Sequence, residues 1–287
     1  MRLSMETGGL AKRFGEDKAF ELLKQAGFDG VDYSMTGLSE EYNMLDKDYI
    51  KKAAKTKELL NKHNLPCVQA HAPFTFKYTD TISENNERYL EIVRSIEYAA
   101  IIGCETIVVH YVKYDVPYDV DIVKYNLDFY NSFIPYLEKT GVKIAVENLF
   151  RRSPAKRAFG EYLCDPHRHL EFMDMLDSKY FNVCLDLGHT ASAGFLPENS
   201  IRLLGKKIAI THIQDTDYEG DCHMPPYTMK QNWEEIAKAF AEIGYDNDIS
   251  LEIPTFIKKL PDDVIPAGLC FAHSTGRHLI NDIEKFR

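Results

Sequence analysis

Short runs of apolar residues recur along the chain, and a longer segment with a different pattern separates each run from the next. Short apolar runs that alternate with longer amphipathic segments are typical of β-strands in an α/β protein. They predict eight β-strands, at Leu3–Met5, Gly30–Ser34, Pro66–His71, Thr106–Tyr111, Lys143–Asn148, Asn182–Leu187, Ile208–Gln214 and Ile249–Ile253.

The segments between these runs carry apolar residues at the three- and four-residue spacing of an amphipathic helix. One helix is predicted to begin after Ser83, a plausible N-cap, and to end at Gly103. Further helices are predicted over about 119–139 and from near Asn232 to before Gly244. The run 264–286 also has helical spacing, which Pro266, Gly268 and Gly276 interrupt, and it is expected to pack on the barrel or on a second subunit.

Strands that alternate with helices predict a parallel sheet, and eight such units predict closure into a (β/α)8 TIM barrel of the α/β class. Neither a linker nor a shift in composition divides the chain, so residues 1–287 are interpreted as one barrel domain. Two long irregular stretches, 150–166 and 216–231, follow predicted strands. Loops of this kind cover the active site of a barrel.

Acidic residues and histidines stand at or just beyond the carboxyl ends of the predicted strands. Because these ends meet at one mouth of a barrel, side chains far apart in sequence are expected to converge there. Small residues alternate with the acids on the same strands (Ala145, Cys184 and Ser250), which leaves space below them. The candidate ligands are His71, His110, Glu147, Asp186, His189, His212, Asp221, His223 and Glu252.

Buried carboxylates repel one another and lose hydration, so a converging set predicts a divalent cation among them. Mixed nitrogen and oxygen ligands suit Mn, Zn, Mg or Co without selecting one. Any single strand-end acid is more often an N-cap or surface group, and a lone histidine is usually structural; it is the repetition at consecutive strands that predicts a site. The remaining histidines, expected to be structural, are His63, His167, His169, His273 and His278.

Composition and charge limit the classes of partner and the cellular location that are expected. The 287 residues carry a net charge of −10, which argues against general nucleic-acid binding, and no apolar run is long enough to span a membrane. None of the six cysteines forms a C-x-x-C pair and the first residues lack an apolar signal core, so a cytoplasmic location is expected.

The ligand-bearing segments resemble the sugar phosphate isomerase/epimerase superfamily, the xylose isomerase-like barrel group that includes ketose 3-epimerases, inosose isomerases and dehydratases, and endonuclease IV. The resemblance covers nearly the whole chain in order. It rests on QAHAPF at 69–74, VVH at 108–110, VENL at 146–149, LDLGH at 185–189, THIQD at 211–215, DCH at 221–223 and LEI at 251–253.

This resemblance implies a metal-dependent sugar or sugar-phosphate isomerase or epimerase that removes a proton next to a carbonyl through a metal-stabilised enediolate. It implies a metal site of Glu147, Asp186, His212 and Glu252, with Glu147 and Glu252 also acting as the acid/base pair. His71, His110 and His189 would contact substrate or, with Asp221 and His223, hold additional metal. A small-molecule sugar is the expected partner, and a homo-oligomer is left open.

Three alternatives stay open beside that interpretation. Endonuclease IV would use all nine positions for three zinc ions in a phosphodiesterase, an inosose-type dehydratase would use the same metal site, and a sugar-binding barrel would have no activity. The chain also departs from ketose 3-epimerases, which carry an Arg soon after the strand-7 His, where this chain has Gln214-Asp215-Thr216-Asp217. In many relatives a Gly-rich turn follows Asp-x-His, where this chain has the stiffer Met224-Pro225-Pro226-Tyr227.

A local basic cluster follows predicted strand 5, at Arg151, Arg152, Lys156 and Arg157. It is either a solvated loop or a clamp for a substrate phosphate or carboxylate, in which Arg151 and Arg152 would bind the charged group. Aromatic residues near the strand ends either line the pocket or pack in the core; these are Phe14, Phe74, Tyr111 and Phe150.

Overall fold

A computed structural model describes residues 1–36, 44–112, 120–152, 158–160 and 162–287, without side chains for 151, 152 and 158–160. Eight parallel strands form one sheet in the order β10-β1-β2-β3-β4-β5-β8-β9. They are β1 Leu3–Glu6, β2 Gly30–Ser34, β3 Cys67–His71, β4 Thr106–Val109, β5 Lys143–Glu147, β8 Phe181–Asp186, β9 Ile208–His212 and β10 Ile249–Leu251.

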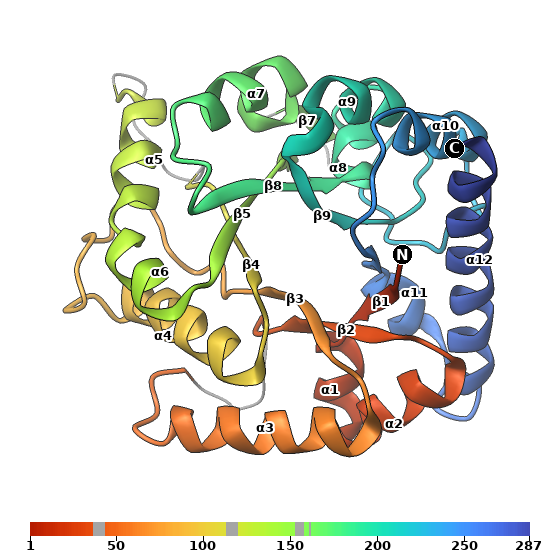
Figure 1. Ribbon diagram of the computed structural model, residues 1–287, viewed down its shortest axis with the longest axis horizontal. Helices are drawn as coiled ribbons and strands as arrows, with labels where there is room; N and C mark the ends of the chain where they lie inside the picture. Colours follow the sequence, from red (N-terminus) through yellow and green to blue (C-terminus); the bar gives the residue numbers. More distant parts are fainter. Residues whose placement is uncertain (37–43, 113–119, 153–157, 161) are drawn as a thin grey trace.

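The sheet closes on itself between β9 and β10. The Ile213 backbone N–H donates to the Ser250 carbonyl (2.8 Å), and the Glu252 N–H donates to the Ile213 carbonyl (3.1 Å). Figure 1 shows the resulting ring of strands with helices around its outside. The predicted (β/α)8 TIM barrel is therefore confirmed, and all eight strands lie at the predicted places.

Helices cover the outside of the barrel and bury their apolar faces against it. The helices in the described part of the chain are α1 Gly8–Phe14, α2 Glu16–Ala26, α3 Tyr49–His63, α4 Glu87–Ile102, α5 Ile122–Asn131, α6 Ile134–Thr140, α7 Pro166–Asp174, α8 Leu187–Ser192, α9 Pro197–Leu204, α10 Trp233–Glu242, α11 Pro254–Lys259 and α12 Ile265–Phe286, with short 3-10 turns η2 Tyr162–Cys164 and η3 Gly205–Lys207. In the described ranges, none of them has the length and apolarity needed to cross a membrane.

Two helix predictions need correction. The N-cap of α4 is Asn86 and not Ser83, because the Asn86 side chain accepts hydrogen bonds from the N–H groups of Arg88 (3.0 Å) and Tyr89 (3.1 Å). The single helix predicted over 119–139 is two helices, α5 and α6. The helix is interrupted at Ser132 and Phe133. Pro135, in the first turn of α6, has no backbone N–H and cannot donate the hydrogen bond that would continue α5.

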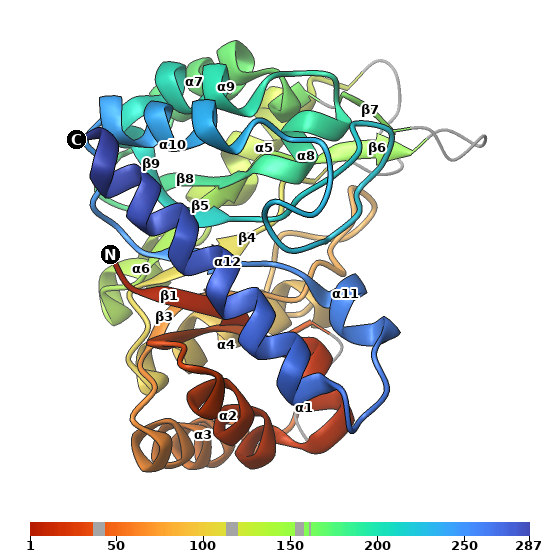
Figure 2. The same cartoon turned by 90° about the vertical axis from the view of Figure 1, so that its right-hand side faces the viewer.

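The C-terminal helix α12 runs without interruption along the side of the barrel, as Figure 2 shows. Gly268 and Gly276, which weaken the helical pattern in the sequence, allow α12 to pack closely against its neighbours. A Cβ at Gly276 would lie 2.8 Å from Leu3 Cδ1, and one at Gly268 would overlap the Leu260 side chain. In this structure the helix packs on the barrel, which was one of the two predicted arrangements.

Inside the barrel, small and medium side chains fill the space below the carboxyl ends of the strands. Val108, Ala145, Cys184 and Ile210 form a separate buried apolar cluster. The prediction that small residues lie below the acids of β5 and β8 is therefore confirmed for Ala145 and Cys184.

Candidate functional site

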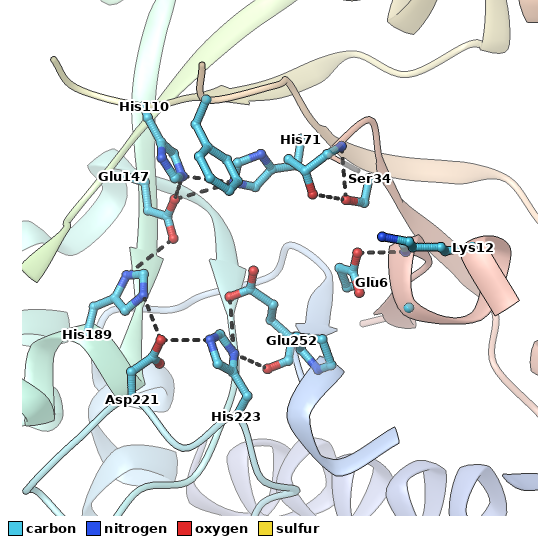
Figure 3. A pocket seen from close by; sticks show the side chains of 15 residues that line it. Glu6, Lys12, Ser34, His71, His110, Glu147, His189, Asp221, His223 and Glu252 are labelled. Atoms are coloured by element: carbon cyan, nitrogen blue, oxygen red, sulfur yellow. Dashed lines mark hydrogen bonds and ion pairs between the residues drawn. The ribbon is translucent and has the colours of Figure 1, made fainter. Parts of the chain in front are cut away.

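The predicted ligands gather at the carboxyl ends of the strands. Seven of the nine project from separate strands and loops into one cavity of about 490 Å³ (Figure 3), namely His71, His110, Glu147, His189, Asp221, His223 and Glu252. Asp186 and His212 are fully buried and are not part of the cavity lining. His71, Glu147, Asp186 and His212 end β3, β5, β8 and β9, while His110 and Glu252 directly follow β4 and β10. His189 lies on α8, and Asp221 and His223 lie on the segment 216–231.

Within the described residues these side chains form three groups, two of which share Glu147, and in each group one candidate ligand atom per residue lies within 4.8 Å of the others. The first group consists of His71, His110 and Glu147. His110 Nε2 lies 3.0 Å from His71 Nε2 and 2.9 Å from Glu147 Oε2. Two imidazole nitrogens and a carboxylate oxygen therefore face one small volume.

The second group consists of Glu147, Asp186, His212 and Glu252, the predicted single metal site. His212 Nδ1 lies 3.0 Å from Glu147 Oε1 and 3.5 Å from Glu252 Oε2. Cys184 also lies close to Glu147 and His212, and burial raises the pKa of its thiol to about 12, so a cation would have to displace a tightly held proton to bind it. The oxygen-rich set remains as the better metal site.

The third group consists of His189, Asp221 and His223. Asp221 Oδ2 lies 2.8 Å from His223 Nε2 and 3.9 Å from His189 Nε2. This group comes from α8 and the loop that follows β9, so it forms one wall of the cavity rather than its floor (Figure 3).

The histidine rings are oriented as metal ligands are. His71 Nδ1 lies 2.8 Å from the Ala72 carbonyl, His189 Nδ1 2.9 Å from the Asn148 carbonyl, and His223 Nδ1 3.0 Å from the Glu252 carbonyl. Because a carbonyl only accepts, each Nδ1 carries a proton, so it is the Nε2 of each ring that faces the groups described above and that a cation would bind. Backbone carbonyls thus fix the tautomer that a cation requires.

The charges are strongly coupled. Burial raises the pKa of Glu252 well above its usual value, and nearby Asp186 and Glu147 raise it further. Burial also opposes ionisation of Glu147, but His212, His110 and His71 outweigh it and hold its pKa well below the usual range. Burial lowers the pKa of His223, but Asp221 and Glu252 raise it to about 10.

The buried Oε2 atoms of Glu147 and Glu252 accept no well-formed hydrogen bond. The donor set fits one or more divalent cations.

Comparison with known proteins agrees with this geometry. The model of a family described as xylose isomerase-like TIM barrel matches residues 20–270. The chain belongs to this family. The uncharacterized protein MJ1311 of Methanocaldococcus jannaschii, a relative in sequence, is 30% identical over 202 residues, which cover 68% of this chain and 67% of that protein.

Solved structures show the same fold. A crystal structure of a D-tagatose 3-epimerase-like protein has a TM-score of 0.76 and 22% identity, covering 99% of both chains. A crystal structure of the IOLI protein with a binding zinc atom has a TM-score of 0.72 and 19% identity, covering 100% of this chain and 99% of the other. At these identities the likeness establishes a shared barrel.

Three further residues of this xylose isomerase-like barrel belong to the site but were not predicted. Glu6 ends β1 and lines the cavity, and its Oε1 accepts the Gly8 N–H (2.6 Å). Asp32 of β2 is buried, with Oδ2 3.3 Å from His212 Nε2. Gln214 contacts Asp186 and Asp221. The position of Glu6 after a strand-like run could have revealed it, whereas the other two are defined only by contacts across strands.

The basic cluster falls largely outside the described residues. Lys156 and Arg157 are not described, and for Arg151 and Arg152 only the backbone is, so their role as a clamp stays a prediction. The stretch 150–166, predicted to be irregular, contains a two-stranded hairpin instead, in which β6 Phe150–Arg152 pairs with β7 Ala158–Gly160. The second stretch, 216–231, holds no helix or strand, as predicted.

The aromatic residues divide between pocket and core. Phe74 lies at the mouth, 56% exposed, and its ring stacks on that of His110 with a centroid distance of 4.8 Å. Phe150 packs against His189, at 5.0 Å. Tyr111 is buried beside Phe172, and Phe14 is not part of the cavity lining.

The other histidines lie outside the three groups. His169, for example, is fully buried, and burial lowers its pKa to about 4, so it is neutral at physiological pH.

Proposed function

We propose that this protein is a divalent-metal-dependent isomerase or epimerase of a sugar or sugar phosphate. The observation that carries the proposal is the group Glu147, Asp186, His212 and Glu252, whose ligand atoms lie within 4.8 Å of one another. A group of this composition suits a hard or borderline divalent cation. The names of solved structures with the same fold, among them D-tagatose 3-epimerase-like and D-psicose 3-epimerase proteins, support a sugar as substrate.

The proposed reaction is removal and return of a proton on a carbon next to a carbonyl. A cation bound here would supply Lewis acidity and help to orient the sugar oxygens. Glu147 ends β5 and Glu252 directly follows β10, and both carboxyl groups point into the cavity (Figure 3). One carboxylate would take the proton and the other would return it, which inverts the carbon if the two act on opposite faces.

The size of the cavity agrees with a small sugar. Its volume of about 490 Å³ falls within the range of roughly 300–1,000 Å³ that is usual for small-molecule sites. Lys12 contributes a cation to the described lining, on the side opposite the metal groups (Figure 3). Lys12 and the predicted clamp of Arg151 and Arg152 are the groups that would bind the phosphate of a phosphorylated substrate.

The test is proton exchange in heavy water, with a panel of ketoses, inososes and their phosphates. We expect deuterium to enter one carbon of at least one sugar. Glu147→Gln and Glu252→Gln should each slow this exchange by at least about a hundredfold, because each removes a proton-transfer group. Glu58→Gln, a change on the exposed face of α3, is the matched control and should exchange at the normal rate.

Near-normal exchange in either folded glutamine variant would refute the role of that residue, and no exchange with any sugar would refute the proposed function. Selective loss with phosphorylated sugars in Arg151→Ala or Arg152→Ala would support the clamp. An equal effect on neutral sugars would reject it.

A second function has a specific observation in its favour. All nine candidate ligands fall into three groups, and the resemblance noted above implies that arrangement for three zinc ions in a phosphodiesterase. Clustered cations suit phosphoryl transfer, although the net charge of −10 opposes binding of a nucleic acid. Hydrolysis of bis(p-nitrophenyl) phosphate or of abasic DNA by zinc-loaded protein, without sugar exchange, would favour this function.

A further inference from the structure

Gln214 joins two of the three ligand groups directly. It is fully buried two residues beyond His212. Its Nε2 donates to Asp186 Oδ2 (3.1 Å) and to Asp221 Oδ1 (2.9 Å), and lies 3.3 Å from Asp186 Oδ1. Its Oε1 accepts the backbone N–H of His223 (2.8 Å). One amide therefore contacts a member of the second group and two members of the third.

The position of the amide is set by its surroundings. Gly188 on α8 leaves the space that the amide occupies, because a Cβ at that position would overlap Gln214 Cδ. The Gln214 carbonyl accepts from Gln231 Nε2 (2.7 Å), which ties the backbone at this point to the end of the loop. The Gln214 amide can therefore occupy this position only because residue 188 is a glycine.

The contacts of Gln214 determine how the third group is presented. Because its Nε2 engages Asp221 Oδ1, the other oxygen, Oδ2, is left beside His223 Nε2 at 2.8 Å. Because its Oε1 holds the His223 N–H, it also supports a residue whose φ of 48° lies in the left-handed region, which non-glycine residues seldom adopt.

The rest of the loop has its own anchor. Asp215 Oδ2 accepts hydrogen bonds from the N–H of Met229 (2.8 Å) and from Trp233 Nε1 (2.9 Å). A change at Gln214 should therefore disturb 221–223 without releasing the whole loop from the barrel.

The charge of the residue also matters. A neutral amide lies between two carboxylates and donates to both without neutralising either, so both remain available to cations. An Arg or Lys there would compete with the cations, and a Glu would repel the two acids. The neutral amide therefore leaves the negative charge of Asp186 and Asp221 intact.

We propose that Gln214 is a positioning residue that couples the His189–Asp221–His223 group to the Asp186 group, so that occupancy of one by a divalent cation favours occupancy of the other. The proposal concerns cation binding and holds whichever reaction the site performs. It requires that ligands on the loop and on β8 share one hydrogen-bonded amide, as the distances above show.

The test uses the full-length protein, stripped of metal and titrated with zinc in a calorimeter, with hydrogen exchange of 216–231 followed in parallel. Gln214→Glu should weaken the zinc sites that involve Asp221 by at least about tenfold, in line with the loss of other outer partners of metal ligands. It should also raise exchange at 221–223. The exposed substitution Gln25→Glu is the matched control and should change neither readout.

A double-mutant cycle separates positioning from a general structural role. Gly188→Ala should displace the amide and reproduce the defect of Gln214→Ala, and the double variant should be no worse than either single variant, because both remove one interaction. Gln214→Met keeps the volume of the side chain and serves as a third variant if Gln214→Glu fails to fold. Wild-type zinc affinity and wild-type exchange at 221–223 in the folded variants, or fully additive effects in the cycle, would overturn the proposal.

Discussion

At the scale of single residues, the site is defined by which nitrogen of each imidazole carries a proton. His71, His189 and His223 each lie with Nδ1 against a backbone carbonyl, so the Nε2 atoms of His189 and His223 face Asp221 and that of His71 faces His110. The residue types and their strand-end positions could be predicted from the sequence. The ring orientations could not, because they depend on carbonyls of Ala72, Asn148 and Glu252 whose directions follow from the fold.

The pKa values predict that cation binding releases protons. In the metal-free site the pKa of His223 is about 10, so its ring is protonated on both nitrogens at neutral pH, and burial together with neighbouring acids raises the pKa of Glu252. A cation must displace these protons, and its apparent affinity should therefore rise as the pH rises toward the pKa of His223.

Zinc titrations at pH 7 in two buffers of different ionisation enthalpy measure this release. We expect about one proton or more for each protein molecule filled, and fewer protons released from His223→Gln. Identical heats in both buffers would contradict the protonation pattern.

At the scale of elements, the apolar pattern located the strands well and the helix ends less well. The apolar runs that predicted β3 and β9 match these strands to within two residues, because a short apolar run between amphipathic segments is a clear strand signal. The break between α5 and α6 was missed, since the apolar spacing continues across Pro135. The hairpin of β6 and β7 was missed because the pattern there shows no alternation.

The N-cap of α4 gives a stability test at this scale. Asn86→Ala removes the acceptor for two backbone N–H groups and should lower the free energy of unfolding by about 1 kcal/mol. Ser83→Ala is the matched control and should cost clearly less, because Ser83 lies outside the helix. Denaturant unfolding of both variants measures the difference, and an equal or larger cost for Ser83→Ala would contradict the assignment.

At the scale of the whole molecule, closure of the barrel is what assembles the site. Hydrogen bonds between Ile213 and its neighbours on β10 complete the ring, which places Glu252 beside His212 and Glu147. The sequence predicted this convergence because parallel strands end at one mouth. It could not predict Asp32 beneath His212 or Gln214 between two acids, because those contacts depend on the register between strands.

The measurement that tests the central claim most directly is anomalous diffraction at the zinc edge from crystals of the zinc-loaded protein. The account predicts a strong peak at the carboxyl ends of β5, β8 and β9, about 2.0–2.2 Å from ligand atoms of Glu147, Asp186, His212 and Glu252. Zinc bound only elsewhere, with these four side chains free of it, would contradict the account.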